Sequence, residues 1–170
     1  MIFRFYLSTG ELPVDFGNKM QLFALLTAAA LTSAAAIPGT ITQRDLPGHC
    51  CFTLQDSAGN TLQEASNGQT YISSSYPNGR YCLDLRSSSK HILYDAANGA
   101  CIVDSSGRMT CLDPIPGNVA WTLGRGNILT YGGSTTWSTC AGSNGKDVFG
   151  GSKSGCTKTT LKAIGKTGTC

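Results

Sequence analysis

The sequence predicts an all-β domain that is cross-linked by disulfides. From residue 50 onward, short segments rich in β-branched and aromatic residues alternate with glycine-containing turns. Asn-Gly, the preferred pair for tight hairpins, occurs four times in this part of the chain. Glycine is abundant, with 21 residues, and charged residues make up only 14%, which argues against a helical bundle, a coiled coil or a disordered tail.

The expected strands form an antiparallel meander over residues 50–164. The meander can be drawn as three blocks, which begin near Cys50, Tyr81 and Trp121. Because each block holds several short strands, we expect a compact antiparallel barrel with β-trefoil-like closure. A two-sheet β-sandwich is the alternative that the same strands allow.

An export signal is predicted at residues 20–36. Lys19 precedes an apolar run, and Ala34 and Ala36 form a small-x-small exit at its end. The run is too short and too rich in alanine for a stable membrane anchor. A secreted, extracellular or cell-wall location follows from this signal.

The signal divides the chain into segments. Residues 1–19 carry Glu11 and Asp15, which fit a basic n-region badly, so Met20 is the favoured start and a long n-region is the alternative. Residues 37–49 are expected to be a linker or pro-segment, and residues 50–170 to be the disulfide-rich β domain.

All the cysteines of the chain follow the predicted signal. An even number of cysteines in a short exported chain indicates a disulfide framework. A zinc site is disfavoured because the sequence has no C-x-x-C pair and only His49 and His91 as histidines. We therefore expect disulfides and no metal or cofactor at Cys50, Cys51, Cys82, Cys101, Cys111, Cys140, Cys156 and Cys170.

Local spacing narrows the pairings. Cys101 and Cys111 flank a short hairpin turn, which predicts that they pair, and Cys140 and Cys156 bracket a glycine-rich segment in the same way. Adjacent cysteines rarely bridge each other. The remaining bridges are therefore expected to join Cys50 and Cys51 to Cys82 and Cys170, in either order.

The net charge of +3 is distributed unevenly. After Trp121, only Asp147 opposes the basic residues Arg125, Lys146, Lys153, Lys158, Lys162 and Lys166. We interpret them mainly as a solvated face, because they are spread over loops and are not interleaved with aromatic residues for base stacking. Acidic polysaccharide is an alternative partner for this charge, and no nucleic-acid partner is predicted.

Two kinds of catalytic site can be weighed. A ribonuclease would need a histidine pair, or a histidine and a glutamate, together with an arginine around one phosphate. The sequence contains residues of these types at His49, Glu64, Arg80 and His91. A glycosidase would need two carboxylates across a cleft. Glu64 could pair only with aspartates beside turns, where the side chain usually caps its own backbone: Asp56, Asp84, Asp95, Asp104 and Asp113. We expect no enzyme.

Aromatic side chains are candidates for sugar stacking. Tyr76 lies in a proline-containing loop, which favours exposure, and Tyr131 and Trp137 are further candidates for carbohydrate contact. Trp121 and Trp137 lie on expected strands between small residues. A core position is therefore the favoured interpretation for both tryptophans.

The last block combines an aromatic strand at Trp121, a Leu-x-Tyr segment between Gly126 and Ser134, Trp137 shortly before Cys140, and two later cysteines. This block resembles the C-terminal domain of fungal PIR-type cell-wall mannoproteins. The double cysteine at residue 50 and the segments 81–85 and 99–111 are similar to related small secreted cysteine-rich fungal proteins.

The resemblance implies a non-enzymatic, structural protein that is secreted or associated with the cell wall. PIR proteins are linked to wall glucan through glutamines in N-terminal repeats, and no such repeat lies between Ala36 and Cys50. One alternative is a secreted effector, elicitor or protease-inhibitor-like protein that acts on a host protein. The other is a carbohydrate-binding module of the wall.

Overall fold

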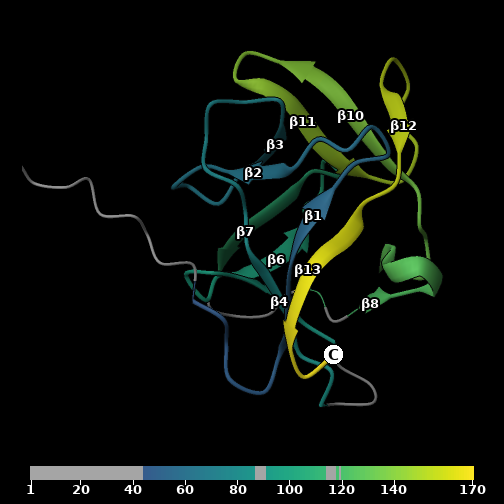
Figure 1. Cartoon of the computed structure of the whole chain (residues 1–170). Helices are drawn as coiled ribbons and strands as arrows, with labels where there is room; N and C mark the ends of the chain where they lie inside the picture. The colour runs from purple at the N-terminus through teal and green to yellow at the C-terminus, as the bar shows by residue number, and fades with distance from the viewer. Residues whose placement is uncertain (1–43, 87–90, 114–117, 119) are drawn as a thin grey trace, which may run out of the picture. The chain divides into compact units, whose positions relative to one another are not determined.

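The computed structural model describes residues 44–86, 91–113, 118 and 120–170, which are coloured in Figure 1. The predicted export signal, the residues before it and most of the predicted linker lie outside this part of the chain. Within it, the chain forms thirteen β-strands and one 3₁₀ turn, η1 (Arg125–Asn127). No helix in the described ranges is long and apolar enough to cross a membrane. The all-β prediction is confirmed.

The strands form three antiparallel sheets. The largest has the order β13 (Lys162–Gly168), β1 (Cys50–Gln55), β4 (Tyr81–Leu83), β5 (Leu93–Asp95), β6 (Ala100–Val103), β7 (Met109–Asp113). The second has the order β12 (Thr157–Thr159), β10 (Trp137–Gly142), β11 (Gly145–Gly150), β3 (Thr70–Ile72), β2 (Leu62–Glu64). The third is the hairpin of β8 (Trp121–Leu123) and β9 (Leu129–Tyr131).

The sheets do not close into the barrel that the sequence analysis favoured. Where one sheet meets another, pairing shortens to isolated bridges, such as those of Gln69 with Thr110 and of Ile128 with Lys162. Two larger open sheets fit the β-sandwich alternative instead. β3, β7 and β11, one from each of the three expected blocks, contact one another.

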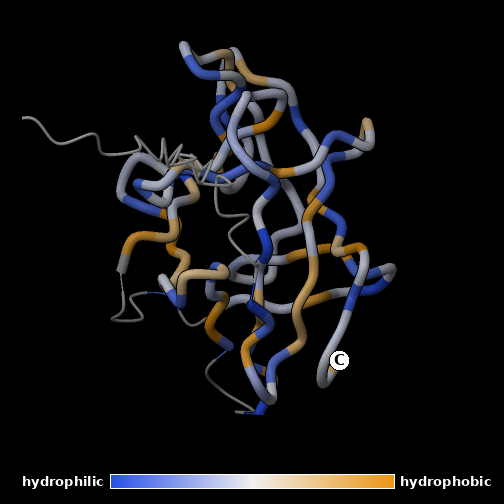
Figure 2. The backbone as a smooth tube through the Cα atoms, turned by 60° about the vertical axis from the view of Figure 1, so that its left-hand side comes forward, coloured by the Kyte–Doolittle hydropathy of each residue, from blue (hydrophilic) through white to orange (hydrophobic). Residues whose placement is uncertain are grey.

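The core is built from the inward faces of these strands. Figure 2 shows orange hydrophobic stretches alternating with white and blue ones along the backbone. Trp121 and Trp137 stack at its centre with ring centroids 5.9 Å apart. Each indole N–H donates to a backbone carbonyl, Trp121 to Cys101 and Trp137 to Leu129, both at 3.1 Å. Both rings are therefore buried with their polar atom satisfied.

The Asn-Gly pairs do not form the turns that the sequence predicts. In none of the four pairs do both residues have positive φ: Gly68, Asn98 and Gly145 have it, one in each of three pairs, and neither residue of the Asn78-Gly79 pair does. Several other strand connections are turns that hold one residue with positive φ. In three of the strand connections an aspartate Oδ1 accepts hydrogen bonds from the backbone N–H groups two and four residues later: Asp56, Asp95 and Asp104. The prediction that aspartates cap turns is confirmed at these positions.

Candidate functional site

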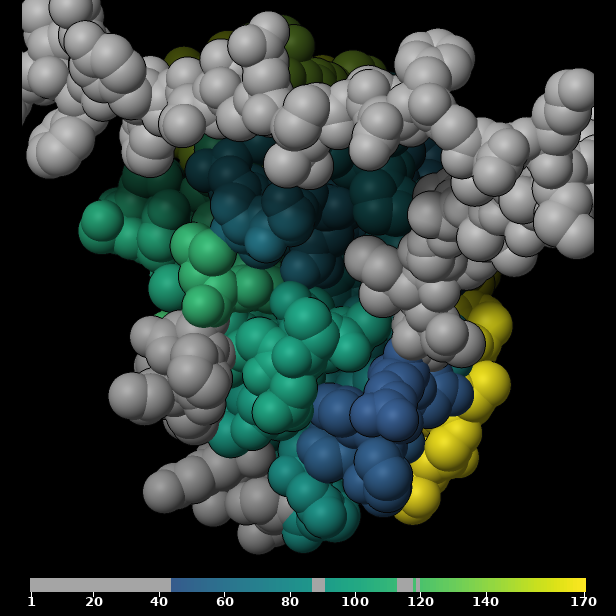
Figure 3. Space-filling model, turned by 90° about the vertical axis from the view of Figure 1, so that its left-hand side faces the viewer, coloured from purple at the N-terminus to yellow at the C-terminus, as the bar shows by residue number. Residues whose placement is uncertain are grey.

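The two ends of the described domain are joined side by side. Figure 3 shows the residues before and within β1 lying directly against the C-terminal strand, and β1 pairs with β13 on one side and β4 on the other. Cys50 bridges Cys170, and Cys51 bridges Cys82 on β4. The adjacent cysteines thus bond to different segments, which resolves the order that the sequence left open.

The other two disulfides match the predicted pairs. Cys101 and Cys111 lie directly opposite each other on β6 and β7, ten residues apart in sequence. Cys140 of β10 bridges Cys156, which precedes β12. A carboxylate oxygen of Asp45 lies within 4.8 Å of the Cys51 and Cys82 sulfurs. These sulfurs form a disulfide, so they are not the thiolates that a metal site requires.

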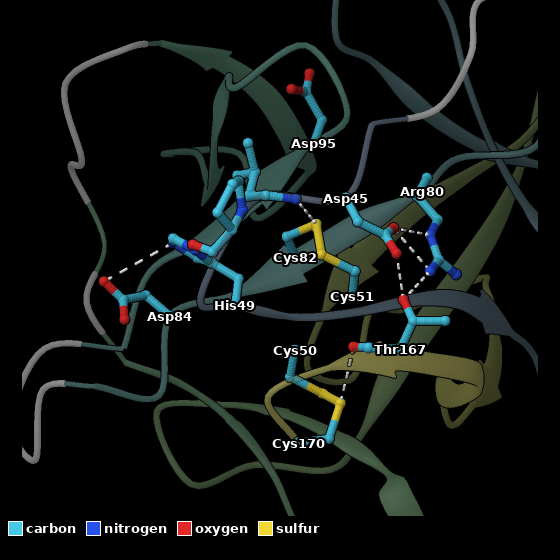
Figure 4. Close-up of a disulfide and its surroundings, with 12 residues drawn as sticks. Asp45, His49, Cys50, Cys51, Arg80, Cys82, Asp84, Asp95, Thr167 and Cys170 are labelled. Atoms are coloured by element: carbon cyan, nitrogen blue, oxygen red, sulfur yellow. Dashed lines mark hydrogen bonds and ion pairs between the residues drawn. A yellow bond between two sulfur atoms is a disulfide. The ribbon is translucent and has the colours of Figure 1, made fainter.

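A polar cluster beside this junction joins the segment before β1 to β13 (Figure 4). Arg80 Nε and Nη2 lie 2.9 and 2.8 Å from Asp45 Oδ1, and Nη2 donates to Thr167 Oγ1 at 2.6 Å. The Thr167 hydroxyl in turn donates to Asp45. That hydrogen bond is the main cause that lowers the pKa of Asp45, and the Arg80 charge adds to it. The cluster acts with the Cys50–Cys170 disulfide to hold the two ends together.

The residues weighed for a ribonuclease do not share one site. His49 Nδ1 lies 3.0 Å from the Pro47 carbonyl, and its Nε2 is 3.9 Å from Asp84. Arg80 belongs to the Asp45 cluster, and His91 lies in an isolated backbone bridge with Ala120. Each candidate thus has its own partners, and no phosphate-binding group is assembled from them within the described residues.

Among the weighed carboxylates, Glu64 and Asp95 are brought together with Tyr81. Tyr81 lies opposite Asp95 in the β4–β5 register, and the Glu64 backbone N–H donates to Pro77 at 3.0 Å, so the loop before β4 runs along β2. Burial is the main cause that raises the pKa of Glu64 to about 9, and its hydrogen bond with Asp95 adds to this. Glu64 is therefore protonated at neutral pH.

The Tyr81 side chain completes this buried acid cluster of Glu64, Tyr81 and Asp95. Its hydroxyl is buried, and no described group forms a hydrogen bond of ordinary geometry with it. Burial and the nearby Glu64 carboxyl raise its pKa well above the ordinary value. The sequence offers one signal for this cluster, the single glutamate after residue 36, but the pairing depends on how the strands pack.

Two glycines leave room for the acid cluster. A Cβ at Gly79 would lie 2.3 Å from the Tyr81 hydroxyl, and one at Gly99 would lie 2.9 Å from Asp95 Oδ2. Neither glycine has positive φ. Glycine is therefore needed at both positions for close packing and not for the geometry of a tight turn.

The other weighed aspartates have separate roles. Asp56 and Asp104 cap their own turns, and Asp84 accepts from Arg86 Nε at 3.0 Å. This hydrogen bond is the main cause that lowers the pKa of Asp84 to about 2. The side chain of Asp113 lies outside the described residues. Only Glu64 and Asp95 therefore form a carboxyl pair among the described candidates.

The aromatic candidates for sugar contact are placed differently from one another. Trp137 is 1% exposed and stacks on Trp121 in the core, so its ring presents no surface to a sugar and the prediction that it contacts carbohydrate is wrong. Tyr131 is half-buried and packs against Trp121 with ring centroids 4.9 Å apart. Tyr76 is half-buried against Tyr71 at 5.1 Å. Sugar contact by the two tyrosines stays a prediction.

A shallow groove with hydroxyl groups along its walls lies elsewhere on the domain. Its volume is about 350 Å³, and it is lined by Ser57, Thr136, Lys158, Thr159 and Thr160. The Thr159 hydroxyl accepts from the Ser57 backbone N–H at 3.1 Å, which fixes the turn after β1 against β12. Sequence reasoning missed this groove, because its walls come from segments that are distant along the chain.

No family model and no curated protein matches this chain. The resemblance to PIR-type proteins therefore remains a prediction from the sequence. A function has to be argued from the disulfide framework and from the groups that the fold brings to the surface.

Proposed function

We propose that this chain is a non-enzymatic secreted protein of the cell wall or the extracellular space, in which the disulfide-linked β domain has a structural role. The observation that carries the proposal is the set of four disulfides, which leaves no free cysteine. Such frameworks persist in oxidising compartments and are rare in reducing ones.

The distribution of the disulfides supports a role that requires durability. The Cys50–Cys170 bridge spans 120 residues and joins the first strand to the last residue, and the other bridges lie inside its loop. Each bridge contributes roughly 2–4 kcal/mol by restricting the unfolded chain. A domain closed in this way resists local opening at its ends, where proteases usually begin.

The predicted family resemblance is consistent with this role. The residues on which it rests include Trp121 and Trp137 at the centre of the core, and Cys140, Cys156 and Cys170 in disulfides. They belong to the framework of the fold. The resemblance therefore supports a structural role and indicates no catalytic one.

Fractionation of the producing cells into medium, wall and membrane tests the proposal. We expect the chain in the wall fraction, from which hot detergent with a reductant releases it, with its cysteines oxidised before extraction. Recovery from the medium alone would contradict wall association and favour an effector that acts on a host protein. Recovery from the cytosol with free thiols would overturn the whole proposal.

A carbohydrate-binding wall module is the second candidate, and the hydroxyl-lined groove favours it. Hydroxyl groups both donate and accept hydrogen bonds, as sugar hydroxyls do. Retention of the purified protein on insoluble glucan or chitin at low salt would support this function. No retention on either polymer would remove neutral wall glycans as ligands.

A further inference from the structure

The exposed cations of the C-terminal part are not used in ion pairs. Within the described ranges, the four ion pairs involve His49, Arg80, Arg86 and Arg108. Asp147 is the only acidic residue after Trp121, and its Oδ1 forms an ion pair with Arg108 Nη2 at 2.7 Å. The basic residues that follow Trp121 therefore keep their charge available to a partner.

Three of these basic residues lie on segments that meet at one turn. Lys166 Nζ donates to Asn127 Oδ1 at 2.9 Å, and Lys162 forms a backbone bridge with the next residue, Ile128. Arg125 is exposed in the same turn, η1, which contacts β13. Figure 1 shows β12, β13 and η1 along the same side of the domain. Together with Lys158 of β12, these residues form the basic strip, namely Arg125, Lys158, Lys162 and Lys166.

The basic strip is continuous with the hydroxyl-lined groove. Lys158 belongs to both, and Thr160 in the groove wall is two residues before Lys162. The link between them is fixed, because Leu161 is fully buried and its carbonyl accepts from Leu129 at 2.8 Å. Thr160 of the groove wall and Lys162 of the strip are thus held two residues apart on ordered backbone.

This combination selects a class of ligand. Ammonium groups pair with carboxylate, sulfate or phosphate, and hydroxyl groups form hydrogen bonds with sugar hydroxyls. The groove walls contain no aromatic ring on which a nucleobase would stack. A polymer that carries both anions and many hydroxyls matches the surface better than a nucleic acid does.

We propose that the groove and the basic strip form one binding site for an acidic polysaccharide. This inference rests on the proposed function, because such polymers are extracellular, and it names the class of partner for the domain. The sugar chain lies in the groove among Ser57, Thr136 and Thr160, and its anionic groups pair with Lys158 and Lys162.

Titration of the full secreted protein with polygalacturonate tests the proposal. We expect the double variant K158E/K162E to bind on the order of tenfold more weakly than the wild type, with a smaller dependence of affinity on salt. K146E is the matched control, because Lys146 on β11 is also exposed and lies outside the strip. An equal loss in K146E would overturn the site, since it would show an effect of net charge alone.

A second pair of variants separates sugar recognition from charge. T136V/T160V removes two groove hydroxyls without changing charge, so it should weaken binding to polygalacturonate and leave binding to inorganic polyphosphate unchanged. Equal binding of neutral dextran, or of single-stranded DNA with the same sensitivity to both variants, would overturn the proposal. Unchanged melting temperatures exclude misfolding as the cause of any loss.

Failure of this binding site and failure of the proposed function give different experimental results. A chain found in the wall fraction that does not bind polygalacturonate or dextran sulfate in solution would leave the structural role intact and remove this site. Binding in solution by a chain recovered only from the medium would contradict wall association and leave this site intact.

Discussion

Glu64 gives this domain a pH dependence of stability that runs opposite to that of most carboxylates. Its pKa is about 9 in the folded chain, compared with an ordinary value of 4.5, because it is buried beside Asp95. Between these values the unfolded chain releases the proton and the folded chain keeps it, so stability falls as the pH rises. Below pH 4.5 both states hold the proton, and this loss disappears.

The variant E64Q should remove this dependence. Glutamine keeps an N–H donor for Asp95 and has no proton to lose, so we expect a gain on the order of 1–2 kcal/mol at pH 8 and little change at pH 4. Thermal unfolding at both pH values measures it.

D84N is the contrasting variant. The pKa of Asp84 is lowered to about 2, so its stabilising charge is present at pH 7 and is lost as the pH falls to 2. D84N should therefore weaken the fold at pH 7 and not at pH 2. For E64Q, a free energy of unfolding at pH 8 equal to that of the wild type would mean that Glu64 is already ionised in the folded chain.

Gly79 is a second position where one residue decides local packing. In G79A, the new Cβ would lie 2.3 Å from the Tyr81 hydroxyl and 2.6 Å from its Cζ. Because the Tyr81 ring is fully buried and cannot move aside, we expect a loss of about 2–3 kcal/mol in urea unfolding.

Gly124 supplies the matched control for Gly79. A Cβ there would lie 3.4 Å from its nearest neighbour, and the φ of −80° suits any residue. G124A should therefore change stability by less than about 1 kcal/mol. Equal effects of the two variants would mean that crowding against Tyr81 is not the cause.

At the scale of elements, the recurring unit is the hairpin turn with an aspartate at its start. In the turn between β6 and β7, Asp104 Oδ1 accepts from the backbone N–H of Ser106 at 2.8 Å and of Arg108 at 2.9 Å. Gly107 has a φ of +84°, which completes the turn. The aspartate adds two hydrogen bonds to the backbone ones that close this turn, from the Gly107 N–H to the Asp104 carbonyl at 2.8 Å and from the Asp104 N–H to the Arg108 carbonyl at 2.9 Å.

Removal of this cap should cost a modest amount of stability. We expect D104A to lose about 1 kcal/mol in urea unfolding, because two backbone donors lose their partner. D104N keeps an acceptor oxygen and should lose less. The exposed neighbour Ser105 is the control, and S105A should be neutral. A D104A variant as stable as S105A would contradict the role of the cap.

The strands and turns also show which structural features a local sequence pattern can predict. The alternation of short strands and turns located the strands, because side-chain period and turn chemistry are local properties. The Asn-Gly pairs misled the choice of turn, because neither Gly79 nor Gly99 has positive φ and each is crowded by a buried side chain, that of Tyr81 or of Asp95. A local pattern cannot distinguish a glycine that serves positive φ from one that serves close packing.

At the scale of the whole molecule, the disulfides were the most predictable feature and sheet closure the least. Cys101 and Cys111 could be paired from one hairpin alone. The order of Cys50 and Cys51 depended on which strand flanks each side of β1, which is set by the return of β13 from the far end of the chain. Whether the sheets close into a barrel depends on how they meet, and they meet only through single bridges, such as that of Arg108 with Phe149, which leave no pattern in the sequence.

The span of each disulfide predicts how much of the stability it carries. The Cys50–Cys170 loop holds 120 residues and the Cys101–Cys111 loop holds 10, so removing the first restores far more freedom to the unfolded chain. In the chain-entropy model, C50A/C170A should lose about 2 kcal/mol more than C101A/C111A. Urea unfolding of both variants measures the difference, and proteolysis should attack C50A/C170A first near the chain ends. If C101A/C111A were the weaker protein, the terminal bridge would not be what holds the domain closed.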